Sequence, residues 1–164
     1  MLKLFLLRHA KSSWDDISFI DIERPLGKRG LKDAPNMGKY FIKDHKKPHI
    51  IISSPARRAR ETAELFSDTI EYKLDKIHYD QQIYEASLDE LMHLIHKIDD
   101  AFEKVMLVGH NPGFTDLANH LTSETHIDNI PTCGLFAVGF DVKSWKKIEP
   151  GKGVFLFFDY PKKH

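Results

Sequence analysis

The sequence predicts an α/β fold in three layers, α-β-α, with a mostly parallel central sheet. Short apolar runs at 3–7, 49–53 and 104–109 are typical of strands that are covered on both faces. Segments with apolar residues at helical spacing separate these runs, and strands that alternate with helices favour a parallel sheet. The chain has 164 residues, the length of one domain, so we expect a single domain over 1–164.

The first part of the chain begins with the strand at 3–7 and a long loop over 11–27, which is mixed polar and aromatic. A helix is expected over 31–43, where apolar residues recur on one side. Pro35 lacks a backbone N–H. It therefore either marks the first turn of this helix, with Asp33 as the N-cap, or kinks the helix.

The strand at 49–53 is followed by Ser54 and Pro55, residue types that are preferred at the N-cap and at the first position of a helix. We therefore expect a helix that begins there and ends near Phe66. A weaker strand is expected near 76–79.

The second half of the chain continues the alternation. Apolar residues at helical spacing predict an amphipathic helix over 88–98. The strand at 104–109 leads into a helix over 113–121, and two further strands are expected at 135–140 and 154–158. These last two strands are consecutive, which is compatible with an antiparallel pair.

The charge balance and the cysteine content indicate which classes of partner and which cellular compartment to expect. Lys and Arg together number 24, as do Asp and Glu, so no global field attracts nucleic acid or an anionic membrane. The apolar run at 4–7 is too short for a signal peptide or a membrane span. Cys133 is the one cysteine and cannot form an intramolecular disulfide, so we expect a cytoplasmic protein.

Basic side chains and histidines follow three of the predicted strands. Arg8 and His9 end the first strand, arginines within 57–60 follow the second, and His110 follows the third. Ligands of open α/β sheets bind beyond the carboxyl ends of the strands, so we expect these side chains to share one pocket. Guanidinium groups and helix N-termini suit a phosphate dianion.

A neutral imidazole in such a pocket can attack phosphorus. Neighbouring arginines disfavour the protonation of His9, and they can hold the oxygens of a transferring phosphoryl group. Taken singly, the arginines would be a solvated helix face and His110 a structural histidine. Their joint occurrence at strand-to-helix junctions favours a functional site.

Three motifs are recognisable at these junctions: Arg8-His9-Ala10, Ser54-Pro55-x-x-Arg58-Ala59-x-x-Thr62 and Gly109-His110. They resemble the histidine phosphatase superfamily, which has the phosphoglycerate mutase-like fold. Longer strings at 8–14, 23–26 and 108–113, with Gly30, resemble its SixA-type phosphohistidine phosphatases. The resemblance extends over at least residues 2–121.

The resemblance implies a role for each matching residue. His9 would be the nucleophile that becomes phosphorylated, Arg8 and Arg58 would bind the phosphoryl oxygens, and His110 would stabilise the transition state. Glu85 stands where many members carry an acidic proton donor. Its carboxylate is equally well explained as a favourable charge near a helix N-terminus. No metal and no cofactor are implied.

Several positions depart from the superfamily pattern or lie beside it. Ala10 replaces the more usual glycine, and Asp15 replaces an asparagine of the mutase-like members. An inward carboxylate would repel phosphate, so we expect Asp15 to face away from the site. Arg57 and Arg60 are expected at the surface. Trp14 is either a lid contact or a loop anchor.

The resulting hypothesis is a phosphatase that forms a phosphohistidine on His9 and acts on phosphohistidine in a protein. A phosphatase of small phosphomonoesters is the first alternative. A non-catalytic phosphoprotein-binding module is an alternative of another class, although a binding module has no need of a nucleophile. A metal hydrolase is a third alternative, which activity in the presence of a chelator would exclude. The oligomeric state is left open.

Overall fold

The computed structural model describes residues 1–16 and 18–164. Within them, six strands form one sheet in the order β3-β2-β4-β1-β5-β6. The strands are β1 (Leu2–Arg8), β2 (Ile50–Ser53), β3 (His78–Tyr79), β4 (Lys104–Gly109), β5 (Leu135–Phe140) and β6 (Val154–Asp159). Strands β1 to β4 are parallel, whereas β5 runs antiparallel to β1 and β6 runs antiparallel to β5. The predicted mostly parallel sheet and its antiparallel pair are confirmed.

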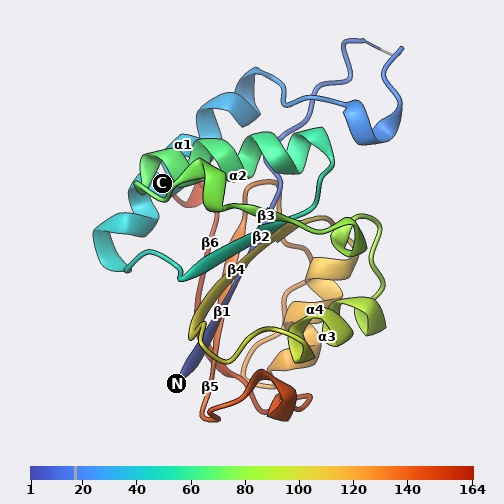
Figure 1. Cartoon of the computed structure of the whole chain (residues 1–164). Helices are drawn as coiled ribbons and strands as arrows, with labels where there is room; N and C mark the ends of the chain where they lie inside the picture. The colour runs from blue at the N-terminus through green and yellow to red at the C-terminus, as the bar shows by residue number, and fades with distance from the viewer. Residues whose placement is uncertain (17) are drawn as a thin grey trace.

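Helices cover both faces of the sheet, as the three-layer prediction requires. They are α1 (Lys28–Asp44), α2 (Arg57–Thr69), α3 (Leu88–His96) and α4 (Gly113–Leu121). Helices α1 and α2 pack together on one face, and α3 and α4 lie on the other (Figure 1).

The side chains of β1 show how one strand serves two cores. Leu4 and Leu6 belong to the apolar cluster beneath α3 and α4, whereas Phe5 and Leu7 belong to the cluster beneath α1 and α2. All four are buried, which explains why this strand is a continuous apolar run without polar alternation. The two cores hold the carboxyl end of β1 rigidly in the middle of the sheet.

Helix α1 begins earlier than predicted. The amide of Leu31 already donates to the carbonyl oxygen of Gly27, so the helix includes Lys28 and continues through Pro35. Asp33 is therefore not an N-cap. It lies one turn after Arg29 and forms an ion pair with that side chain at 3.6 Å.

The predicted N-cap at Ser54 is wrong. Helix α2 begins at Arg57, and Ala56 is its N-cap residue. The hydroxyl of Ser54 accepts a hydrogen bond from the amide of Ala56 in a local turn, and it also contacts His110. The Ser-Pro pair thus forms a short bend that lets the serine reach another strand end.

Two other elements are shorter than predicted. Residues Leu74–Lys76 form a 3₁₀ turn, which leaves only His78–Tyr79 for β3. Helix α3 ends at His96, and Lys97 is its C-cap. Both differences lie at the ends of elements, where the local sequence determines the boundary least well.

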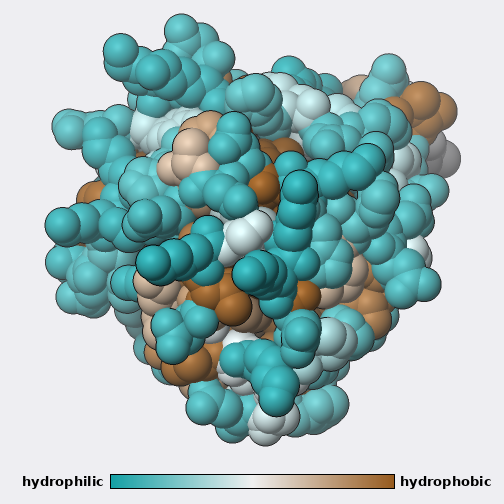
Figure 2. All heavy atoms as spheres, turned by 60° about the horizontal axis from the view of Figure 1, so that its bottom comes forward, coloured by the Kyte–Doolittle hydropathy of each residue, from teal (hydrophilic) through white to brown (hydrophobic). Residues whose placement is uncertain are grey.

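Figure 2 brings forward the lower end of the view in Figure 1, away from the carboxyl end of β1, and shows a mainly hydrophilic surface with small hydrophobic patches. In the part of the chain that the structure describes, none of the helices has the length and hydropathy to cross a lipid bilayer.

Candidate active site

Three neighbouring strands end at the same edge of the sheet. In the register of the sheet, Arg8 of β1 pairs with Gly109 of β4, and Ser53 of β2 pairs with Val108. The residues directly after these strands are His9, Ser54 and His110. The sheet therefore brings together the three motifs, which are far apart in the sequence.

His9 is buried, with 7% of its surface exposed, and its ring is held in one tautomer. Nδ1 lies 2.8 Å from the carbonyl oxygen of Ala10. A carbonyl oxygen can only accept, so Nδ1 carries the proton and Nε2 carries a free lone pair. Burial, together with the nearby charges of Arg58 and Arg8, lowers the pKa of His9 to about 3. His9 is thus a neutral imidazole whose Nε2 can act as a nucleophile.

Arg8 and Arg58 each present a buried donor that has no partner. Arg8 is held by a 2.8 Å hydrogen bond from Nη1 to the carbonyl oxygen of Ile130, while its Nε has no partner among the described residues. The Nε of Arg58 is also buried and has no partner among the described residues, and 7% of the surface of Arg58 is exposed. Buried guanidinium donors without an acceptor are costly, and a bound anion would satisfy them.

His110 lies beside His9, with the ring centroids 5.3 Å apart and the planes at 51°. Its Nε2 lies 2.7 Å from the hydroxyl oxygen of Ser54, and its buried Nδ1 has no partner within the described part of the chain. Burial, followed by the charge of Arg58, lowers the pKa of His110 to about 3. His110 therefore offers a neutral ring nitrogen to a ligand of His9.

The structure thus brings Arg8, Arg58 and His110 close to His9. Two cationic groups and a second neutral imidazole act on the ring of His9. This arrangement can bind a tetrahedral dianion through charge-assisted hydrogen bonds and place it next to Nε2 of His9.

Glu85 is not brought into hydrogen-bond contact with any of these four residues. It is exposed, with a backbone φ of 56° in the turn before α3. Asp89 and Glu90 lie in the first turn of α3, and Glu90 forms a capping box with Ser87. Glu85 lies two residues before this N-cap, so its explanation as a charge near a helix N-terminus stays an alternative to a role as proton donor.

Asp21 is a polar residue of the site that sequence reasoning missed. It lies on a 3₁₀ turn, η1 (Asp21–Glu23), within the segment predicted as a loop. Its carbonyl oxygen and its carboxylate Oδ2 accept hydrogen bonds from Arg58, at 2.8 and 3.0 Å. The Tyr84 hydroxyl donates to the same Oδ2 at 2.6 Å, and Arg24 Nη2 lies 3.3 Å from Oδ1.

These contacts show what the sequence could have signalled. Arg24 belongs to one of the strings that resemble the SixA-type proteins, so its involvement could have been anticipated. Tyr84 is next to the candidate Glu85, and its ring packs edge-on against His110 with centroids 5.6 Å apart. No pattern marks Asp21, because its position depends on how the loop folds back over α2.

The remaining predicted positions lie at the surface. Trp14 is 68% exposed and faces the Arg24 guanidinium, with Cζ 3.8 Å from the ring centroid, so it is a loop-anchoring contact. Asp15 is exposed, and Arg57 and Arg60 form ion pairs with glutamates one turn further along α2.

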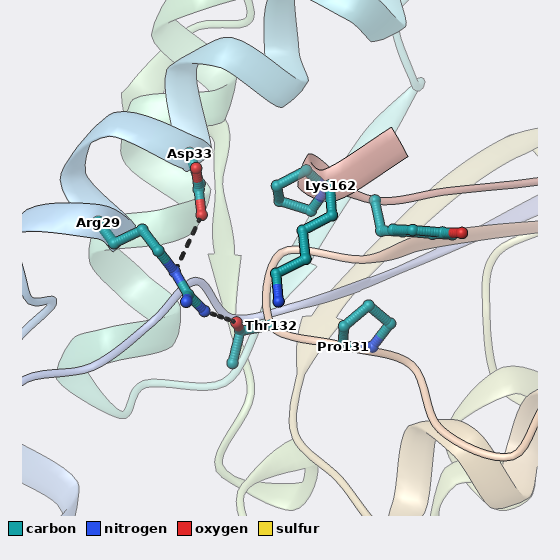
Figure 3. A pocket seen from close by; sticks show the side chains of 7 residues that line it. Arg29, Asp33, Pro131, Thr132 and Lys162 are labelled. Carbon is teal, nitrogen blue, oxygen red and sulfur yellow. Dashed lines mark hydrogen bonds and ion pairs between the residues drawn. The ribbon is translucent and has the colours of Figure 1, made fainter. Parts of the chain in front are cut away.

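A tight turn after residue 129 supports the backbone of His9. Cys133, buried and with φ of 61°, donates its amide to the carbonyl oxygens of both Arg8 and His9. A separate pocket of about 360 Å³ opens beside this turn, and Figure 3 shows Arg29 between Asp33 and Thr132 at its wall. None of the four central residues lines that pocket, so it is distinct from the candidate active site.

Among residues 1–16 and 18–164, no three His, Cys, Asp or Glu side chains are grouped so that they could hold a metal ion. The positive charge of the site comes from its guanidinium groups.

Solved phosphatase structures are similar to the whole chain. One assigned as the phosphohistidine phosphatase SixA of Agrobacterium tumefaciens is 25% identical, with a TM-score of 0.83 and 98% of both chains covered. The protein histidine phosphatase SixA in complex with tungstate has a TM-score of 0.84 at 18% identity, covering 99% of both chains. A mycobacterial glucosyl-3-phosphoglycerate phosphatase has a TM-score of 0.72 at 14% identity, covering 94% of this chain and 99% of that one. The predicted phosphoglycerate mutase-like fold is confirmed.

Sequence comparison adds a relative and a family. An uncharacterised chloroplastic protein of Arabidopsis thaliana is 31% identical over an alignment of 153 residues, which covers 88% of this chain and 69% of that protein. The model of the histidine phosphatase superfamily (branch 1) matches residues 4–125, a range that includes all three motifs. The chain therefore belongs to branch 1 of the histidine phosphatase superfamily, with SixA-type phosphohistidine phosphatases among its structural neighbours.

Proposed function

We propose that residues 1–164 form one phosphatase domain that hydrolyses protein phosphohistidine through a covalent phosphohistidine on His9. The observation that carries this proposal is the state of the four central residues. His9 is a buried neutral imidazole with a free Nε2, and the partnerless donors of Arg8, Arg58 and His110 surround it. A tetrahedral anion is the ligand that would satisfy all of them together.

The reaction has two steps. In the first, His9 Nε2 attacks phosphorus in line, the bond from phosphorus to the leaving group breaks, and the leaving group takes its electron pair. In the second, water attacks phospho-His9, and inorganic phosphate and the free imidazole are formed. Arg8 and Arg58 hold the phosphoryl oxygens in both steps, and His110 donates to the same group as charge develops. No step needs a metal ion or a cofactor.

Glu85 is proposed as the proton donor to the leaving group, a role that matters most for poor leaving groups. An alcohol that leaves a phosphate ester needs a proton. An imidazole that leaves a phosphohistidine can already be protonated on its other nitrogen, since histidine titrates near pH 6.5. Glu85 is exposed at the end of a turn. This position suits a proton donor that is needed only for substrates with poor leaving groups.

Two observations support a protein as the substrate. Trp14 and Ile20, on the segment that follows His9, are 68% and 62% exposed, and large exposed apolar side chains at a site suit a macromolecular partner. The SixA structures, one of them of a protein histidine phosphatase, align with 98% and 99% of this chain. Separately, the buried, unpaired Cys133 agrees with a cytoplasmic site of action.

The test is to incubate the purified protein with a phosphorylated histidine domain and to look for acid-labile phosphate on the protein. We expect phosphate release, a transient phosphoprotein, full activity in chelator, and no activity in His9→Ala. Competition between the phosphorylated domain and a panel of sugar and glycerate phosphates separates the protein substrate from small esters. Undiminished turnover by His9→Ala would exclude the scheme, and binding without any phosphoprotein would favour a binding module.

A further inference from the structure

The guanidinium of Arg58 is paired with Asp21. The terminal nitrogens Nη1 and Nη2 donate to the carbonyl and carboxylate oxygens of Asp21, at 2.8 and 3.0 Å. Only Nε of Arg58 is buried without a partner in the described part of the chain. A residue expected to bind phosphate is therefore already paired with an internal anion.

The carboxylate of Asp21 is held firmly in this position. The Tyr84 hydroxyl donates to Oδ2, and Arg24, which itself donates to the hydroxyl of Ser12, reaches Oδ1. The hydrogen bond from Tyr84, with the nearby charge and hydrogen bond of Arg58, lowers the pKa of Asp21 to about 2. Asp21 thus carries a full negative charge throughout the neutral pH range.

This charge lies close to the phosphoryl site. Arg58 is the guanidinium that both Asp21 and the phosphoryl group require, and the charge of Asp21 also acts on the ring of His110. A carboxylate that is paired with Arg58 repels a phosphate dianion that binds the same guanidinium. The two anions then share the positive charge of Arg58. Such a residue would weaken the binding of phosphate, which is the product of the reaction.

We propose that the Asp21 carboxylate competes with inorganic phosphate for the guanidinium of Arg58. The ion pair between Asp21 and Arg58 re-forms as phosphate leaves, and this speeds the release of phosphate. Asp21 is in this sense a positioning residue that acts through Arg58. The inference rests on the proposed function, because it assumes that Arg58 binds the phosphoryl group. It extends that function by assigning product release to a residue outside the four central ones.

Calorimetric titration of inorganic phosphate tests the competition directly. In Asp21→Asn the side chain keeps a carbonyl oxygen for Tyr84 and the backbone keeps its hydrogen bond to Arg58, while the charge is lost. We expect this variant to bind phosphate about tenfold more tightly than the wild type, a change of about 1.4 kcal/mol. In turnover assays it should show the same increase in inhibition by phosphate, together with a lower kcat.

Glu23→Gln is the matched control. Glu23 lies on the same 3₁₀ turn, is exposed, and has no side-chain partner in the described part of the chain. Its substitution removes an equal charge and should change phosphate affinity by less than about twofold, because the carboxylate of Glu23, unlike that of Asp21, forms no ion pair with Arg58 in the described part of the chain. Equal or weaker phosphate binding by Asp21→Asn than by Glu23→Gln would overturn the proposal and leave Asp21 as a structural clamp.

Asp21→Ala serves as a second variant if the asparagine variant does not fold, and it should shift phosphate affinity in the same direction. Phosphate binding is measured without turnover, which separates this inference from the proposed reaction. Tighter binding by Asp21→Asn in a protein that never forms phospho-His9 would support the competition and overturn the reaction. Formation of phospho-His9 without tighter phosphate binding by Asp21→Asn would support the reaction and overturn the competition.

Discussion

The imidazole rings of His9 and His110 lie 5.3 Å apart, and burial keeps the pKa of both histidines at about 3. Two protonated rings at this distance would repel each other and both arginines. The site therefore holds two neutral imidazoles, His9 as the proposed nucleophile and His110 as its proposed hydrogen-bonding partner in phosphoryl binding.

The first prediction is that neither ring titrates between pH 7.5 and pH 5. Nitrogen-detected NMR of the labelled protein should show His9 and His110 as neutral tautomers over this range, with the proton of His9 on Nδ1. The same sample in urea is the control, because unfolded histidines titrate near pH 6.5. A midpoint near pH 6.5 for His9 in the folded protein would contradict the prediction.

The second prediction concerns stability. The pKa of each histidine is about 3 in the folded protein, whereas the unfolded chain binds protons near pH 6.5. The unfolded state therefore takes up more protons below pH 6.5, and the free energy of unfolding falls as the pH is lowered from about 6.5 towards 3. The slope should reach at most about 1.4 kcal/mol per pH unit for each histidine. Urea titrations at several pH values measure this slope, and His110→Gln should lose about half of it.

The third prediction is that the Ser54 hydroxyl fixes the tautomer of His110. The hydroxyl already accepts from the amide of Ala56, so its own proton can be given to Nε2 of His110, which leaves Nδ1–H to face the phosphoryl group. A neutral hydrogen bond of about 0.5–1.5 kcal/mol corresponds to a loss of about threefold to tenfold in kcat/KM for Ser54→Ala. Ser53→Ala is the control, because the hydroxyl of Ser53 bonds only the carbonyl oxygen of Ser54 among the described residues. Equal losses in both variants would remove this role from Ser54.

The central residues were predictable because each belongs to a strand end or to a helix that follows one. Arg8, His9 and His110 follow continuous apolar runs, and parallel strands necessarily bring their carboxyl ends to one edge. Asp21 and Tyr84 were not predictable, since both lie in irregular segments whose path is set by contacts distant in the sequence. The cap expected at Ser54 failed for a related reason. Its hydroxyl contacts His110, a residue on another strand end that no local pattern reveals.

The fourth prediction is that the contribution of Glu85 to catalysis depends on the leaving group of the substrate. Glu85→Gln should reduce the hydrolysis of an alkyl phosphate ester by about a hundredfold, in the range typical of a lost general acid. Hydrolysis of protein phosphohistidine should change by less than about threefold, since its leaving imidazole can carry its own proton. Asp89→Asn removes a nearby exposed charge and is the control. Equal effects on both substrates would exclude Glu85 as the proton donor.

The fifth prediction tests how α1 supports the nucleophile. Gly30 is buried on α1, and a Cβ atom placed on it would collide with the backbone carbonyl of Lys11, two residues after His9. Helix propensity alone would make Gly30→Ala stabilising by about 1 kcal/mol, but a backbone group cannot move aside as a side chain can. We therefore expect a loss of about 1–3 kcal/mol in the free energy of unfolding. A lower kcat/KM should accompany it, because the segment after His9 must shift.

Gly27→Ala is the matched control for this experiment. A Cβ atom on Gly27 would meet the backbone of Ser12 and Ser13 only at 3.6 Å, an ordinary contact, although this glycine lies less than one turn before Gly30. Its substitution should leave both the free energy of unfolding and kcat/KM nearly unchanged. If Gly30→Ala were instead as stable and active as Gly27→Ala, the close approach of α1 to Lys11 would not be what holds His9 in place.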